Sequence, residues 1–264
     1  MNLPEGHLQK PEVQAYPANK AGWVSPLLLI ILTIALALRL YGITWDQGNF
    51  FHPDERSIYM RVDCMYRLLT EAPGYQGCTR DIPFTNVQPG FPGPVTFLDA
   101  DRSPLNPHWF PLGTMVIYLL LLIKLTLAPI VTMDLGDLAF AGRTLAALAD
   151  VGTVAMVYLL GRRLFGKWAG LLAATLVTFA VVHIQLAHFY RPEPFTNLFT
   201  LAAFWFMLQV LERRRVRDSA LLGLFVGLAF ATKLSVLPLL VPLALLYGYL
   251  LRRILRDSAA EERP

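Results

Sequence analysis

The feature that most constrains this chain is a series of apolar runs, each about twenty residues long and nearly free of charge. As a helix, a run of that length crosses the roughly 30 Å hydrocarbon core of a bilayer. Of the 264 residues, 55% are hydrophobic and only 16% are charged, and the mean hydropathy is +0.47. An ordinary soluble domain has about 25% charged residues. The sequence therefore predicts an all-α polytopic membrane protein.

The apolar runs divide the chain into membrane and aqueous segments. Residues 1–22 and 252–264 are polar and are predicted to form cytoplasmic tails. The run 23–43 is too long for a signal-peptide core and is the first expected transmembrane helix. A long polar loop then fills 44–137. The remaining transmembrane helices are expected at 138–160, 168–188, 195–211, 219–232 and 235–251.

Basic clusters at 162–167, 213–217 and 252–256 predict the orientation, because Lys and Arg in short loops face the cytoplasm. All three would lie outside if 109–133 also crossed the membrane. Lys124 lies inside that run, where it would cost about 2.5–3.5 kcal/mol at the bilayer centre. We therefore expect 109–133 to be an interfacial helix within an extracytoplasmic loop. An ordinary span with an inverted remainder is the alternative.

These clusters hold ten of the 23 Lys and Arg residues in short segments next to apolar runs. The basic residues therefore indicate topology, and no nucleic-acid partner is expected. The unusual polar residues are instead predicted to gather on the outer face. Asp54 and Glu55 follow the first apolar run and lie among aromatic residues. Adjacent carboxylates near a low-dielectric boundary suit general-base chemistry. The alternatives are a solvated pair or an acidic pair at a helix N-terminus after Pro53.

Four further charged residues are expected at the outer boundary of the membrane, at the same depth as Asp54 and Glu55. Arg191 and Glu193 lie on either side of a proline between two apolar runs, while Arg143 and Lys233 lie near the outer ends of others. Cations there could bind a phosphate. Polar residues at the end of a span can also form only an interfacial belt. Ionisable residues at membrane depth nevertheless indicate function by default.

The order of these segments resembles the GT-C glycosyltransferases, and within them the phospholipid carrier-dependent group of protein O-mannosyltransferases and aminoarabinose transferases. The similarity rests on His-Pro-Asp-Glu at 52–55, on Gly-Leu-Ala-Phe-Ala-Thr-Lys at 227–233, and on further short motifs at 106–113, 142–143, 158–166 and 190–193. Each motif is short, but their order and spacing cover most of the chain. The chain resembles the N-terminal membrane module of such an enzyme.

The resemblance implies inverting sugar transfer from a polyprenyl-phosphate donor, on the extracytoplasmic face, to a protein, lipid or glycan acceptor. It makes Asp54 the general base, and Glu55 a neighbour that positions the acceptor or a cation. Arg143 and Lys233 would neutralise the departing lipid phosphate. Arg191 and Glu193 would form the second charged motif, and His108 would be a further substrate-binding residue at the start of helices that lie along the membrane.

A divalent cation is compatible with this site, with His52 and His188 as candidate ligands, although no ligand spacing is diagnostic. Each histidine could instead make only interfacial hydrogen bonds.

Cys64 and Cys78 are the only cysteines, and both fall in the predicted outer loop. A disulfide between them is expected in an oxidising compartment, with two unpaired thiols as the alternative. The expected location is the plasma (inner) membrane.

Length is the main departure from the family, whose members usually continue through more spans. The chain could be a minimal module, a truncated product or one part of a split enzyme. A second hypothesis is a non-catalytic membrane component, such as a partner in lipid-linked sugar transport. Transporters often contain inverted repeats, and no internal repeat is visible here.

The predicted topology puts the loop after residue 133 outside. A small epitope tag inserted at Gly136 should therefore be reached by a probe added to intact cells. The same tag in the 213–217 cluster should be reached only after permeabilisation. Protection of the Gly136 tag in intact cells would contradict this topology and favour the inverted one.

Overall fold

The computed structural model describes residues 26–70, 97–98, 103–107, 110 and 112–261. Regular structure in these residues is entirely helical. The helices are α1 (Pro26–Leu40), α2 (Pro53–Thr70), α3 (Met115–Leu127), α4 (Leu135–Phe165), α5 (Lys167–Thr178), α6 (Val181–Ala187), α7 (Pro192–Arg213), α8 (Val216–Thr232), the 3₁₀ helix η2 (Leu234–Leu239) and α9 (Leu240–Glu261).

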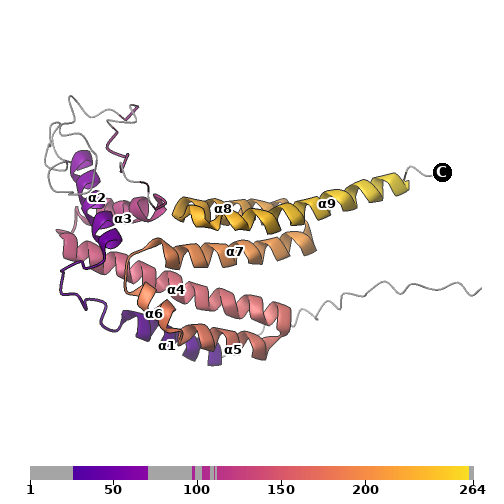
Figure 1. Ribbon diagram of the computed structural model, residues 1–264, viewed down its shortest axis with the longest axis horizontal. Coiled ribbons are helices and arrows are strands. Elements are labelled where there is room, and N and C mark those ends of the chain that lie inside the picture. Colours follow the sequence, from indigo (N-terminus) through magenta and orange to yellow (C-terminus); the bar gives the residue numbers. More distant parts are fainter. Residues whose placement is uncertain (1–25, 71–96, 99–102, 108–109, 111, 262–264) are drawn as a thin grey trace, which may run out of the picture.

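The long helices α4, α7, α8 and α9 run side by side, with α1 and α5 on the other side of α4 (Figure 1). Helices α2 and α3 cover one end of this bundle, and α2 lies across the direction of the long helices (Figure 1). The C-terminal ends of α4, α7 and α9 lie at the opposite end. Three described helices are long and apolar enough to cross a membrane, and a bent pair would make a fourth. The chain is thus an all-α polytopic membrane protein, as predicted.

The helix bounds differ in detail from the expected spans. The predicted span 138–160 lies within the 31-residue helix α4. The segment 168–188 is a pair, α5 and α6, bent by 59°. In the predicted interfacial segment 109–133, the described residues form one helix, the 13-residue α3, which is about 20 Å long and too short to cross a bilayer. Its Lys124 is buried against α2, where its ammonium pairs with Asp63.

Local sequence explains where the main helices begin. Asp134 and Asp137 form a reciprocal capping box at the start of α4, which satisfies two backbone N–H groups. Gly166 alone joins α4 to α5 and has a φ of 94°, which a glycine adopts without strain. Pro192 begins α7, where its missing N–H costs no helical hydrogen bond.

Glycines let α4 and α5 approach closely. A Cβ added to Gly161 would lie 2.9 Å from the Cα of Gly170. A Cβ on Gly170 would lie 2.7 Å from the backbone nitrogen of Arg162 and from the carbonyl oxygen of Tyr158. The neighbouring atoms are backbone and cannot move aside as a flexible side chain could. The α4–α5 hairpin therefore depends on these two small residues.

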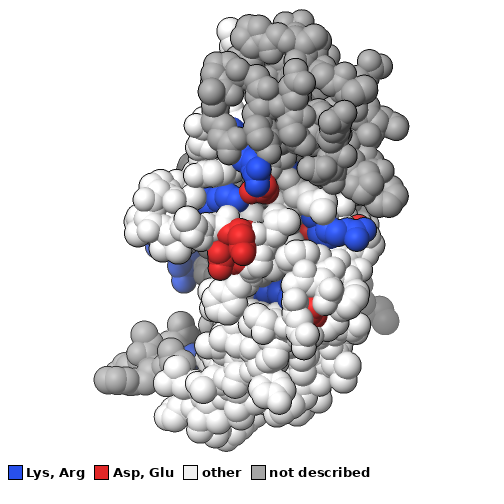
Figure 2. Space-filling view, turned by 90° about the vertical axis from the view of Figure 1, so that its left-hand side faces the viewer, with Lys and Arg blue, Asp and Glu red and all other residues white. Residues whose placement is uncertain are grey.

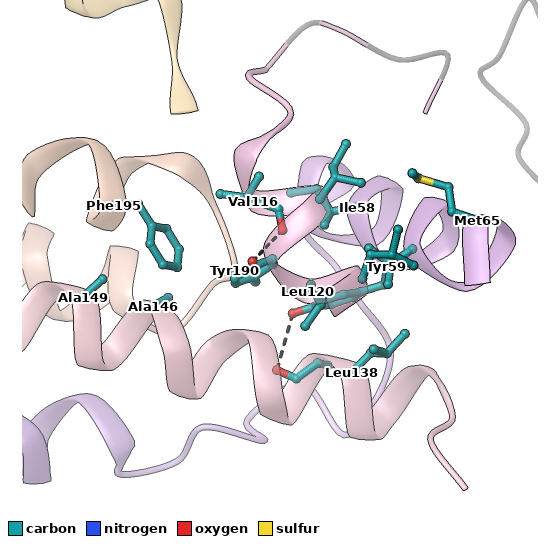
Figure 3. Packing of buried hydrophobic residues seen from close by; sticks show 14 residues of the cluster. Ile58, Tyr59, Met65, Val116, Leu120, Leu138, Ala146, Ala149, Tyr190 and Phe195 are labelled. Carbon is teal, nitrogen blue, oxygen red and sulfur yellow. Dashed lines mark hydrogen bonds between the residues drawn. The ribbon is translucent and has the colours of Figure 1, made fainter. Parts of the chain in front are cut away.

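The largest apolar cluster joins α2 and α3 to α4 and the start of α7 (Figure 3). Tyr190 lies in it between α3 and α4, and its hydroxyl donates to the carbonyl oxygen of Val116 at 2.6 Å (Figure 3). Ile58, Val116 and Leu120 are fully buried there. This cluster fixes α2 on the end of the bundle.

Gly170→Ala should lower the stability of the purified protein in detergent by about 1–3 kcal/mol, because the new methyl group overpacks the α4–α5 contact. The matched control is Gly227→Ala on α8, where a Cβ would meet nothing within 4 Å. That variant should be neutral or gain up to about 1 kcal/mol from the helix preference of alanine. Thermal unfolding followed by intrinsic fluorescence measures both. Equal effects would contradict the close helix approach.

Candidate functional site

The Asp54-Glu55 pair occupies the first turn of α2, directly after Pro53. The two carboxylates point into different environments. Glu55 is fully buried, whereas the side chain of Asp54 is 35% exposed. Helix geometry separates neighbouring residues by about 100°, so one faces the core and the other the surface. The structure therefore gives the two residues different roles.

Arg143 on α4 binds Glu55 with two parallel hydrogen bonds. Its Nε and Nη2 donate to Oε1 and Oε2 of Glu55, both at 2.8 Å. Its Nη1 and Nη2 also donate to the two carboxylate oxygens of Asp46, at 2.9 and 2.6 Å, and Nη1 donates to the carbonyl oxygen of Ile43 at 2.9 Å. A guanidinium has five N–H groups, and all five are used. Arg143 thus has no donor left for a ligand in this structure.

Asp46 was not among the residues expected to form the site. Its carboxylate accepts from the backbone N–H groups of Gly48 and Phe50, at 3.3 and 3.1 Å. The hydrogen bonds from Arg143 are the main reason that the pKa of Asp46 lies below its usual value. Gln47 and Phe50 have φ values of 51° and 49°, which side chains other than glycine seldom adopt. The Asp46–Arg143 pair therefore holds a strained turn that leads into α2.

Two tyrosines complete the surroundings of Glu55. The hydroxyl of Tyr59 and the backbone N–H of Tyr190 both donate to Glu55 Oε1, at 2.7 and 2.9 Å. Burial, and then the charge of Glu55, raise the pKa of Tyr59 far above its usual value, so the phenol remains a neutral donor. The buried carboxylate joins α2, α4 and the segment before α7.

The other charged residues predicted from the sequence, Arg191, Glu193 and Lys233, form a series of ion pairs with Asp54 on the partly exposed side of the start of α2. This Lys233–Glu193–Arg191–Asp54 chain is the charged cluster of the site. Lys233 Nζ lies 2.8 Å from Glu193 Oε1, and Arg191 Nη2 lies 3.1 Å from the same oxygen. Arg191 Nη2 is also 3.5 Å from Asp54 Oδ2. Lys233, Arg191 and Glu193 have side chains 33%, 22% and 20% exposed. The structure thus brings together residues from three segments distant in sequence, around positions 54, 191–193 and 233.

Not every polar atom of this charged cluster has a hydrogen-bond partner. Arg191 Nε and Glu193 Oε2 are buried without a hydrogen-bond partner. Buried polar atoms usually have one. Figure 2 views this end of the molecule and shows separate acidic and basic side chains in an otherwise uncharged surface of described residues. The cluster therefore has unused capacity to bind a polar ligand, unlike the saturated Arg143 network.

A close backbone contact positions Lys233. The backbone N–H of Gly113 donates to the carbonyl oxygen of Thr232 at 3.0 Å. A Cβ on Gly113 would lie 2.1 Å from the carbonyl oxygen of Ala231, so only glycine fits. The segment before α3 thus packs on the end of α8, next to Lys233.

Aromatic rings border the cluster beside Asp54. His52 Nδ1 accepts the backbone N–H of Asp54 at 3.2 Å, and its ring lies 5.1 Å from that of Phe189. Phe189 contacts Trp45, which stacks on the exposed ring of Phe51. Burial, and then the charge of Arg191, lower the pKa of His52, so the ring is neutral at pH 7.

The other candidates lie elsewhere or outside the described residues. His188 has Nδ1 at 2.7 Å from the carbonyl oxygen of Ile184 and Nε2 at 2.8 Å from that of Tyr41. Within the part of the chain that the structure describes, no three His, Cys, Asp or Glu side chains group as metal ligands. Cys64 on α2 is disulfide-bonded. Cys78 and His108 lie outside the described residues.

Comparison with known proteins adds the family. Residues 122–261 match the model of the family described as dolichyl-phosphate-mannose-protein mannosyltransferase. The helical membrane fold and this match define a membrane glycosyltransferase of the GT-C type. The chain belongs to the dolichyl-phosphate-mannose-protein mannosyltransferase family, since the match covers more than half of its length. No curated protein and no solved structure matched the chain.

The match confirms the resemblance inferred from the short motifs. It includes Arg143, Arg191, Glu193 and Lys233, whereas Asp54 and Glu55 precede it. The assignment of Asp54 and Glu55 therefore rests on their geometry and on the sequence pattern.

Arg143→Lys should lower the stability of the protein by about 3–5 kcal/mol, because one ammonium cannot replace five fixed donors to two buried carboxylates. Lys233→Met is the contrasting change at a residue one-third exposed, and it should alter stability by less than about 1 kcal/mol. Thermal unfolding in detergent compares them. A neutral Arg143→Lys variant would mean that the buried network contributes little.

Proposed function

We propose that the protein transfers a sugar from a polyprenyl-phosphate donor to an acceptor hydroxyl on the extracytoplasmic face, with inversion at the sugar carbon. The observation that carries this proposal is the Lys233–Glu193–Arg191–Asp54 chain, in which the partly exposed carboxylate of Asp54 lies beside Arg191. Arg191 and Glu193 each keep one buried polar atom without a hydrogen-bond partner. The family description names dolichyl-phosphate-mannose and protein. A lipid-linked sugar donor and a protein hydroxyl acceptor are accordingly the first candidates.

Asp54 is the general base in this proposal. The acceptor oxygen forms a bond to the sugar carbon while the bond from that carbon to the phosphate oxygen breaks, and the acceptor proton passes to Asp54. Asp54 suits this role better than Glu55, whose oxygens already accept from Arg143, Tyr59 and the Tyr190 backbone. A base must reach its proton directly or through one water.

Lys233 and Arg191 are the cations that would stabilise the departing lipid phosphate, whose negative charge grows as the glycosidic bond breaks. Glu193 lies between them and keeps them in place when no phosphate is bound. Arg143, expected from the resemblance to share this task, instead has all its donors engaged and would act by holding Glu55 and the turn at Asp46.

The extracytoplasmic placement is supported by the distribution of charge along the bundle. The basic clusters lie at or beside the C-terminal ends of α4, α7 and α9. Helix α2 and the Lys233–Glu193–Arg191–Asp54 chain lie at the opposite end of the bundle (Figure 1). Basic residues in short loops mark the cytoplasmic side. The Lys233–Glu193–Arg191–Asp54 chain would then face the periplasm or cell exterior.

Asp54→Asn should reduce sugar transfer by about 10²–10⁴-fold, the usual contribution of a general base, while donor binding is largely kept. The assay uses purified protein in detergent with a polyprenyl-phosphate-mannose donor and a serine/threonine peptide. Asp257→Asn is the matched control, because this exposed carboxylate lies near the opposite end of α9.

Full transfer by the Asp54→Asn variant would exclude the base role. If the unmodified protein bound the donor but transferred no sugar, the alternative of a non-catalytic component in lipid-linked sugar handling would be favoured.

A further inference from the structure

A second charged network lies within the helical bundle, away from the cluster at its end. Arg39 on α1 and Asp150 on α4 are 0% and 1% exposed, and Arg39 Nε donates to Asp150 Oδ2 at 2.6 Å. The other carboxylate oxygen of Asp150 lies 2.7 Å from Nδ1 of His183 on α6. Ionisable residues inside a membrane domain are costly and usually serve a function. This Arg39–Asp150–His183 triad has no place in the reaction proposed above.

The triad lies at the break between α5 and α6. The two helices are bent by 59°, yet the break at Phe179 and Ala180 contains neither glycine nor proline. A sharp bend has an identifiable cause, such as a side chain that takes over backbone carbonyls. Arg39 donates to the carbonyl oxygens of Val177 and Thr178, both at 3.3 Å, where α5 ends. Arg39 therefore stabilises the end of α5 and the change of direction.

Helix α6 leads from the triad to the segment 188–191, and each residue of this segment contacts α2 or the segment just before α2. His188 contacts the carbonyl oxygen of Tyr41, and Phe189 packs on His52 and Trp45. The Tyr190 backbone donates to Glu55, and Arg191 pairs with Asp54. His183 holds the other end of this short helix to α4.

We infer that the Arg39–Asp150–His183 triad is a positioning unit that fixes the α5–α6 bend and thereby holds residues 188–191, including Arg191, against Asp54. The expected effect of the triad on catalysis rests on the proposed function, whereas its expected effect on structure does not. His183 acts through the hydrogen bond from Nδ1 to Asp150. It does not touch the reacting atoms.

Hydrogen exchange of the protein in detergent tests the structural effect, read on peptides that cover 188–191. His183→Leu removes the bond to Asp150 at a side chain only 22% exposed, and it should speed exchange in this segment about tenfold or more. His183→Asn keeps an N–H near the position of Nδ1 and should exchange like the unmodified protein. Arg163→Leu breaks the Arg163–Glu212 pair at the opposite end of α4 and should leave 188–191 unchanged.

Sugar transfer with the same variants tests the catalytic effect. His183→Leu should lower kcat by up to about 100-fold, the cost of a displacement near 1 Å, and His183→Asn should restore most of it. Unchanged exchange at 188–191 in His183→Leu would overturn the inference, as would faster exchange spread equally over α7. It would also fail if His183→Asn exchanged normally but transferred as slowly as His183→Leu, because the imidazole itself would then be required.

The two proposals can fail separately. If the unmodified protein transfers no sugar, the proposed function is lost, while the exchange comparison still decides whether the triad positions 188–191.

Discussion

The fivefold hydrogen bonding of Arg143 is the interaction on which the rest of the site depends. One guanidinium joins the turn before α2, through Asp46 and Ile43, to the first turn of α2, through Glu55. Glu55 in turn accepts from Tyr59 and from the backbone before α7. A buried ion pair is stable only when every donor and acceptor is satisfied, and this one is. The network therefore fixes the start of α2 to α4 and leaves Asp54 at the surface of that helix end.

The degree of pairing separates two kinds of charge in this molecule. The residues around Arg143 are buried and saturated, which suits a structural role. The Lys233–Glu193–Arg191–Asp54 chain is partly exposed, and it contains two buried atoms without partners. Only the second kind can exchange a protein partner for a phosphate or a hydroxyl without leaving a buried charge uncompensated. Charge alone, as read from sequence, does not distinguish them.

Sequence predicted the fold class well because hydropathy is a local property, and a long apolar run has few alternatives to a membrane helix. It also selected Asp54, Arg191, Glu193 and Lys233, which the structure brings together. It missed Asp46, Arg39 and Asp150, and it grouped Glu55 with Asp54. The burial and the hydrogen-bond partners of these residues result from contacts between residues 97 to 135 positions apart in the sequence. A local sequence pattern does not contain this information. A charged residue inside an apolar run, such as Asp150, was the available signal.

Helix α4 links the two buried networks. Arg143 and Asp150 are seven residues apart, which is about two turns, so they lie on the same face of the helix and about 10 Å apart along its axis. One binds the turn before α2 and the start of α2, and the other binds α1 and α6. The start of α2 and the segment 188–191, which meet at Asp54, are therefore both fixed to one face of α4 at two depths. A shift of α4 along its axis would move both anchors together, so Arg191 and Asp54 would keep their spacing even if the helix moved within the bundle.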